Sequence, residues 1–132
     1  MDESPRINVE KQIAFWRDGA IENWKDVEHN INGGRIAFAM FAAHLVIEKV
    51  LKAHVVKNTK KLPPMIHNLI SLANLAGLEL SRQQLQLLAE LNPLNIEARY
   101  PGNFSNEMPS QKEAEAIAKR TKVLLEWLIE KL

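Results

Sequence analysis

Apolar side chains recur three and four residues apart along almost the whole chain, which is the spacing of one face of an α-helix. Before residue 32 this stripe consists of Val9, Ile13, Trp16, Ala20, Trp24, Val27 and Ile31. The last segment repeats the pattern with Ala114, Ile117, Thr121, Leu124, Leu128 and Leu132. No segment alternates apolar and polar residues as a half-buried β-strand would. We therefore predict an all-α fold.

The segment from Ile36 to about Val56 is apolar on two opposite sides. At about 100° per residue, one stripe consists of Ile36, Met40, Ala43, Ile47, Val50 and Leu51. Phe38, Phe41 and Leu45 lie nearly opposite to it. A helix of this kind lies at the centre of a bundle or faces a second subunit. We expect a central helix and a homodimer whose interface includes Phe38, Phe41 or Leu45. The alternative is that other helices of the same chain cover this side.

Turn signals divide the helical segments. The run Asn32-Gly33-Gly34 supplies a left-handed helix end. Residues 58–64 are predicted to form a loop that ends with two prolines. A second, polar loop is predicted from Gly102 to Pro109. A short helix is predicted from about Ile66 to Ala76, with Gly77 at its end.

Capping signals mark two further helix starts, at Ser81 with Gln84 and at Ser110 with Glu113. The dipeptide Asn92-Pro93 is predicted to interrupt the helix that follows Ser81, so that Asn92 caps a last pair of turns. These segments predict an antiparallel up-and-down four-helix bundle with an additional short helix, as one domain over residues 1–132. The predicted core includes Trp16, Trp24, Met40, Ile47, Leu88 and Leu124.

Composition limits the class of protein. At 132 residues, of which 46% are hydrophobic, the chain is large enough for one domain with its own core. It contains no cysteine, which excludes a disulfide framework and a thiolate metal site. A formal net charge of +1 argues against a strongly basic nucleic-acid-binding protein, but not against a local basic patch.

Targeting signals are also missing from the sequence. The N-terminus lacks the basic and apolar regions of a signal peptide. The uncharged stretch between Arg35 and Glu48 is too short to cross a bilayer. We therefore expect a cytoplasmic protein with no membrane partner.

Most signatures of catalysis do not occur. The four histidines, His29, His44, His54 and His67, show no metal-binding spacing, so we interpret each as structural or solvated rather than as a metal ligand. Gly33-Gly34 lacks the lysine and the serine or threonine of a phosphate-binding loop. We predict no catalytic residue, no metal site and no cofactor.

Two segments carry the remaining polar features. His44, Glu48 and Lys52 follow one another at i, i+4 and i+8, which forms a polar row on the second helix. Arg99 and Tyr100 end a helical segment that a proline and a glycine terminate, which leaves both side chains near the rim. On spacing alone, the row contains an intrahelical ion pair, Arg99 pairs with a local carboxylate and Tyr100 packs on a neighbouring helix. The functional alternative is a groove between the row and this helix end.

Three segments stand in register along the chain: residues 44–53, residues 64–69, and Leu91-Asn92 followed by residues 98–101. Together they resemble the HEPN domain family, the nucleotide-binding domain named for higher eukaryotes and prokaryotes. Residues 44–53 resemble its second-helix signature, in which Glu-Lys precedes Leu-Lys-Ala. Residues 64–69 resemble its Pro…His-Asp-Leu segment, with Asn68 in place of the usual aspartate. Leu91-Asn92 followed by residues 98–101 resembles its terminal signature, in the Arg-Tyr-Pro branch of the family. The resemblance runs from about residue 9 to residue 130.

The resemblance implies an up-and-down bundle that commonly forms a homodimer and often works beside a small nucleotidyltransferase in toxin–antitoxin-like pairs. Some members are metal-independent RNases that use an arginine followed about five to seven positions later by a histidine. Here Phe104, Ser105 and Asn106 follow Arg99 at those offsets. The Arg-Tyr-Pro branch is described as nucleotide-binding.

We therefore expect a non-catalytic module that binds a nucleotide or an RNA phosphate and partners a nucleotidyltransferase. The alternatives are a metal-independent RNase in which His44 or His67 replaces the missing histidine, and an assembly domain without a ligand. In the binding hypothesis, phosphate is contacted by Arg99, Lys49 and Lys52. Tyr100 stacks on a base, and Glu48 orients the cations. The candidate ligand-binding residues are Arg99, Tyr100, Glu48, Lys49, Lys52, His44 and His67.

Overall fold

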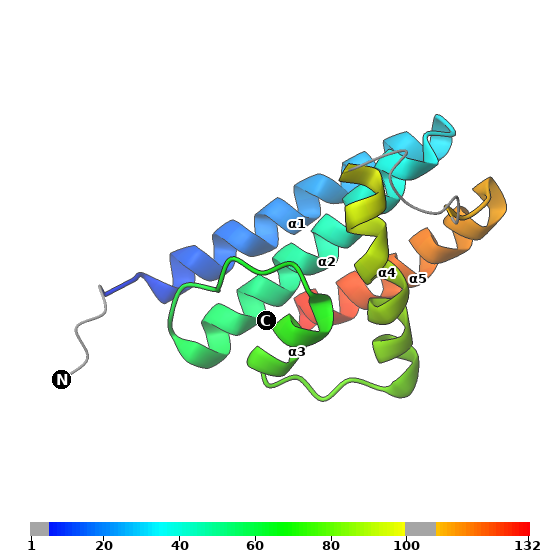
Figure 1. The fold of residues 1–132 in the computed structure, drawn as a ribbon. Coiled ribbons are helices and arrows are strands. Elements are labelled where there is room, and N and C mark those ends of the chain that lie inside the picture. The colour runs from blue at the N-terminus through cyan, green and yellow to red at the C-terminus, as the bar shows by residue number, and fades with distance from the viewer. Residues whose placement is uncertain (1–5, 100–107) are drawn as a thin grey trace.

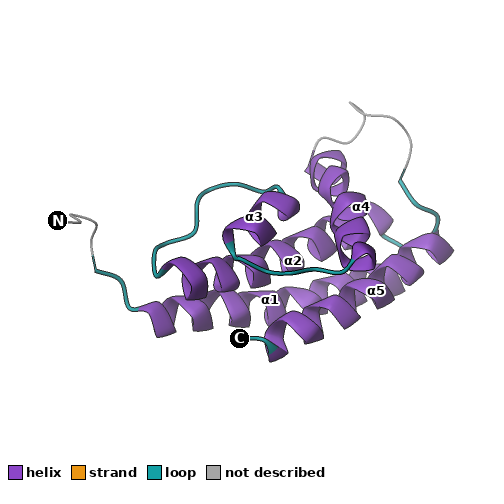
Figure 2. Cartoon of the chain, turned by 90° about the horizontal axis from the view of Figure 1, so that it is seen from below, coloured by secondary structure: helices purple, strands orange, loops and turns teal. Residues whose placement is uncertain are grey.

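The structure is a computed structural model that describes residues 6–99 and 108–132, without the side chains of residues 96–99. This part of the chain forms the helices α1 (Val9–Asn32), α2 (Ile36–Thr59), α3 (Leu69–Leu75), α4 (Arg82–Arg99) and α5 (Gln111–Glu130). Within the described residues there is no strand, and no helix is long and apolar enough to span a membrane (Figure 2). The predicted all-α bundle with one additional short helix is confirmed.

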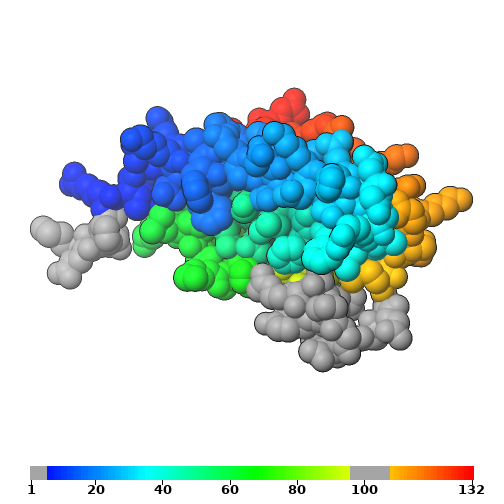
Figure 3. All heavy atoms as spheres, turned by 90° about the horizontal axis from the view of Figure 1, so that it is seen from above, coloured from blue at the N-terminus to red at the C-terminus, as the bar shows by residue number. Residues whose placement is uncertain are grey.

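Helix α2 lies at the centre of the molecule and packs against α1, α3, α4 and α5 (Figure 1). Helix α1 runs antiparallel to it and occupies most of one face of the molecule (Figure 3). Between Ala39 and Val56 every α2 residue is buried except Phe41, Leu45 and Lys49, which are half-buried. Other helices of the same chain therefore cover most of both apolar sides, while Phe38 stays 53% exposed.

The core contains most of the residues predicted for it. Met40, Ile47 and Leu88 are fully buried, and Leu124 is nearly so. The two tryptophans differ, because both are only half-buried: Trp24 packs against the edge of the core, and Trp16 lies outside it. Helix α1 buries only its smaller residues Ala20 and Val27 completely, so the wide indole rings extend to the margins of its contact with α2.

Predicted signals at the helix ends are confirmed by hydrogen bonds and backbone angles. Ser110 and Glu113 exchange side-chain-to-backbone bonds of 3.1 and 3.2 Å at the start of α5. Ser81 and Gln84 do the same before α4, at 3.1 and 2.8 Å. Gly34 has a φ of +71°, the left-handed conformation expected after α1.

The predicted start of the short helix is wrong. Helix α3 begins at Leu69 rather than near Ile66, because Asn68 is its N-cap. The side chain of Asn68 accepts hydrogen bonds from the backbone N–H groups of Ile70 and Ser71, at 3.0 and 3.1 Å. An asparagine cap holds the preceding backbone extended, so the residues before it stay outside the helix.

The predicted interruption at Asn92-Pro93 is also wrong, because α4 continues through Pro93. Proline removes one backbone donor and crowds the preceding turn. Leu91 and Leu94 on either side of it are buried in the core, and this packing holds the two halves in one helix. Asn92 therefore caps no new helix.

His54 is a buried titratable group of α2 that pairs with α5. It is 4% exposed, and its Nε2–H donates to the carbonyl oxygen of Leu128 at 2.7 Å. Burial lowers the pKa of His54, the hydrogen bond to Leu128 opposes that shift, and the charge of Lys57 adds to it. The imidazole therefore takes up a proton less readily in the folded protein than in the unfolded chain.

We expect the free energy of unfolding to fall as the pH drops below the ordinary histidine value of 6.5. A lowered pKa in the folded state means that the unfolded chain binds more protons there, so protonation favours unfolding. Denaturant titrations at about pH 7.5 and pH 5.5 should show this loss in the parent and a smaller one in His54→Gln. The exposed His29 supplies the control, His29→Gln. Identical pH dependence in the parent and His54→Gln would contradict the assignment.

Candidate functional site

Three polar side chains, those of His44, Lys52 and His67, meet around the buried carboxylate of Glu48. These four residues are here termed the Glu48 cluster. Glu48 is 5% exposed despite its charge. Its Oε2 accepts a hydrogen bond from Lys52 Nζ at 3.1 Å, and its Oε1 accepts one from His67 Nδ1 at 3.0 Å. His44 Nδ1 lies 3.6 Å from the same Oε1. The first three residues share one side of α2, as their spacing predicts, and His67 reaches them from the segment before α3.

The ammonium group of Lys52 is enclosed by other side chains. The side chain is 8% exposed, and its Nζ lies 5.2 Å from the centre of the Trp16 ring on α1. A cation over an indole face is attracted by the negative face of the ring. With the carboxylate on one side and the indole on the other, Lys52 balances the charge of Glu48 inside the protein.

Lys49 serves the contact between α1 and α2 and does not join the Glu48 cluster. Its Nζ donates to Asn23 Oδ1 of α1 at 2.6 Å. Its stem passes so close to Gly19 that a Cβ atom there would lie 3.2 Å from Lys49 Cδ. The absence of a side chain at Gly19 therefore makes room for this lysine between the two helices.

His67 is the accessible member of the Glu48 cluster. Its side chain is 49% exposed, whereas that of Glu48 is 7% exposed. An ionised carboxylate only accepts hydrogen bonds, so His67 Nδ1 carries the hydrogen in their contact. The contact fixes the tautomer and leaves Nε2 on the other edge of the ring, where no described residue bonds to it.

Side-chain amides tie α4 to the start of α3, next to His67. Asn92 Oδ1 accepts the backbone N–H of Leu69 at 2.9 Å, and its Nδ2 lies 3.5 Å from Asn68 Oδ1. One turn later, Asn95 is only 6% exposed. Position 99 follows Asn92 by seven residues and Asn95 by four, so helix periodicity puts it on the same face of α4.

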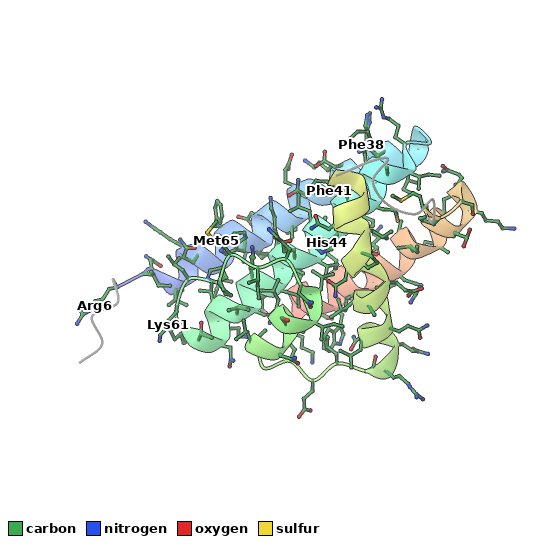
Figure 4. All side chains as sticks on the ribbon, viewed as in Figure 1. Arg6, Phe38, Phe41, His44, Lys61 and Met65 are labelled. Atoms are coloured by element: carbon green, nitrogen blue, oxygen red, sulfur yellow. The ribbon has the colours of Figure 1, made fainter. Side chains whose placement is uncertain are left out.

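The structure brings together some of the predicted site residues. His44, Glu48, Lys52 and His67 form one cluster, and His44 lies on α2 near the point where α4 crosses it (Figure 4). Tyr100 lies outside the described residues. Only the backbone of Arg99 is described, as the last residue of α4.

Sequence reasoning missed three neighbours of this site. Trp16 and Asn23 approach from α1, and Asn92 bonds to the start of α3. The two α1 residues meet α2 across a helix contact, which leaves no spacing signal in the chain. Asn92 does carry a signal, but its place before a proline suggests a helix cap instead.

The chemistry of the Glu48 cluster, rather than a cavity, defines the candidate site. Two surface grooves in the described part of the chain, of about 590 and 290 Å³, lie between α4 and α5 and between α1 and α5. Neither is lined by a residue of the cluster. Among the described residues, no group of three or more His, Cys, Asp or Glu is placed to hold a metal ion. The cluster presents one accessible imidazole, that of His67, beside a buried carboxylate that Lys52 neutralises.

Comparisons with known proteins agree with this fold. The crystal structure of TT1696 from Thermus thermophilus matches with a TM-score of 0.76 and 22% sequence identity, over 92% of this chain and 98% of that one. At this identity the likeness shows a common fold. No curated protein is significantly similar to the chain. The HEPN domain family matches residues 13–132, and the chain therefore belongs to the HEPN domain family.

Proposed function

We propose that this HEPN domain binds the phosphate of a nucleotide or an RNA without cleaving it, at the junction of α2, the segment before α3 and the end of α4. The observation that supports this most is the Glu48–His67 contact of 3.0 Å, which holds a half-exposed imidazole next to the residues that Asn92 of α4 contacts. Arg99 is the last described residue of that helix. A guanidinium group matches the geometry of phosphate oxygens, and an imidazole adds a further donor.

The charges around Glu48 are compatible with a bound anion. A bare carboxylate would repel phosphate, but Lys52 neutralises this one at 3.1 Å. Lys52 is already enclosed, so we assign it this charge-balancing role instead of a direct phosphate contact. Lys49 is likewise engaged with Asn23. Direct contacts are assigned to Arg99 and His67, with Tyr100 stacking on a base.

The proposal is tested by titrating the purified protein with AMP and with a short single-stranded RNA in a calorimeter. We expect saturable binding of at least one of them, and an excess of absorbance near 260 nm if a ligand co-purifies. Absence of both would favour the assembly-domain alternative.

A nucleotidyltransferase partner in a toxin–antitoxin-like system is part of the proposal. Its test is co-purification of the two proteins when the neighbouring genes are expressed together.

A metal-independent RNase is the second candidate, because a carboxylate-oriented imidazole such as His67 is the arrangement of a general base. We nevertheless expect no efficient RNA cleavage by the protein alone, since no histidine follows Arg99 at the spacing of the family's RNases. Structured and unstructured RNA, incubated with the protein in chelator, provide the test. Robust cleavage that Arg99→Ala abolishes would contradict this expectation, and His44→Ala and His67→Ala would then identify the base.

We also propose self-association through the surface around Phe38. Its ring is 53% exposed, and the guanidinium of Arg35 lies 5.1 Å from the ring centre. Phe41 and Leu45 continue this side of α2 in a half-buried state. A two-fold dimer is the usual geometry for such a contact. Light scattering should find a dimer for the parent and a shift toward monomer for Phe38→Ser. Phe15→Ser, at a 64% exposed ring on α1, should stay dimeric, and a monomeric parent would refute the proposal.

A further inference from the structure

We infer that His67 contacts the ligand phosphate only in its protonated form, and that Glu48 is the positioning residue that makes it do so. This inference rests on the proposed phosphate-binding function and specifies how the same site selects its ligand. It makes phosphate binding depend on pH in the range where an imidazole titrates.

The hydrogen-bonding geometry of the imidazole carries the argument. Glu48 Oε1 accepts a hydrogen bond from His67 Nδ1, with 3.0 Å between the two atoms. In a neutral ring this leaves Nε2 with a lone pair and no hydrogen. Phosphate oxygens are also acceptors, so the neutral ring cannot bond to them and its lone pair repels them. Protonation at Nε2 converts the accessible edge of the ring into a charged donor.

The charged groups around His67 are compatible with a positive charge on its ring. On α2, Glu48 bonds to the ring, Lys52 shares the second oxygen of that carboxylate, and His44 lies 3.6 Å from the first. Helix α3 carries no titratable side chain. The site thus has a single described carboxylate, which Lys52 already balances, and a protonated His67 makes the cluster net positive.

Two charged pairs lie on the helices next to this site. On α1, Arg17 bonds to Asp18 at 3.0 Å. On α4, Glu90 pairs with Arg120 of α5 at 2.6 Å.

The experiment measures dissociation constants of AMP and of a short single-stranded RNA at about pH 6 and pH 8. The internal phosphodiesters of RNA stay ionised across this range, so their binding reports the protein's titration. We expect RNA binding that requires a proton on the imidazole to weaken at least several-fold from about pH 6 to about pH 8. Comparing the two probes tells a free nucleotide from an RNA as the source of the phosphate.

Three variants separate this inference from a general effect of pH. His67→Gln supplies an amide donor at every pH, so its RNA binding should lose most of the pH dependence. Glu48→Gln should move the pH midpoint of binding downward, because the carboxylate that favours the imidazolium is gone. His29→Gln, at an exposed histidine of α1, should behave as the parent does.

Two results would overturn the inference in distinguishable ways. If the parent binds but His67→Gln keeps the full pH dependence, His67 is not the titrating contact, while the proposed function stands. If the parent binds neither probe at either pH, the inference and the proposed function fail together.

Discussion

Replacing Glu48 with alanine should lower the free energy of unfolding by about 3 kcal/mol, because it leaves Lys52 buried without a counter-ion. The two side chains are 7% and 8% exposed, and they meet at 3.1 Å. The Trp16 ring still attracts the ammonium of Lys52 in this variant. The expected loss of unfolding free energy is therefore at the lower end of the range for a broken buried ion pair. Urea denaturation followed by circular dichroism gives the value.

A matched control exists on α1, where Glu22 and Lys25 also meet at 3.1 Å but are 72% and 70% exposed. Glu22→Ala should cost less than about 0.5 kcal/mol, because an exposed pair contributes little. The double variant Glu48→Ala, Lys52→Met should recover most of the loss, since no charge then stays buried. A double variant as unstable as Glu48→Ala alone would assign the loss to something other than the unpaired lysine.

The fold was largely predictable because its signals are local. Helix periodicity gave the all-α class, and the hydrogen bonds at Ser81 and Ser110 follow from four-residue capping patterns. Local rules failed where tertiary packing outweighs them. Pro93 stays inside α4 because its neighbours Leu91 and Leu94 are buried on either side of it. The indole of Trp16 lies beside Lys52 and not in the core.

The candidate site was predictable only along α2. Its i, i+4 spacing puts Glu48 next to Lys52, and the structure has that contact. The spacing could not say that the pair is buried, or that His67 donates to Glu48 across 19 positions of sequence. The binding hypothesis also assigned Lys49 to the site together with Lys52, although Lys49 bonds to α1. These contacts depend on how the helices and the segment before α3 pack together, which the pattern of a single helix does not contain.

Arg99→Ala should weaken phosphate binding by about 10- to 100-fold. A hydrogen bond to a charged group contributes about 1.5–3 kcal/mol, and 1.4 kcal/mol corresponds to a factor of ten in affinity. The same helix supplies a control, because Arg82 is exposed at its other end. Arg82→Ala removes the same charge from the protein but not from the proposed site, so its affinity should stay within about twofold of the parent.

The most direct measurement is a calorimetric titration of the parent, Arg99→Ala and Arg82→Ala with single-stranded RNA and with AMP at about pH 6, the lower of the two pH values used for the His67 variants. We predict saturable binding of at least one probe by the parent and Arg82→Ala, and a loss of about tenfold or more for Arg99→Ala. Binding that is equally tight in all three proteins would place the ligand elsewhere on the molecule and contradict the account.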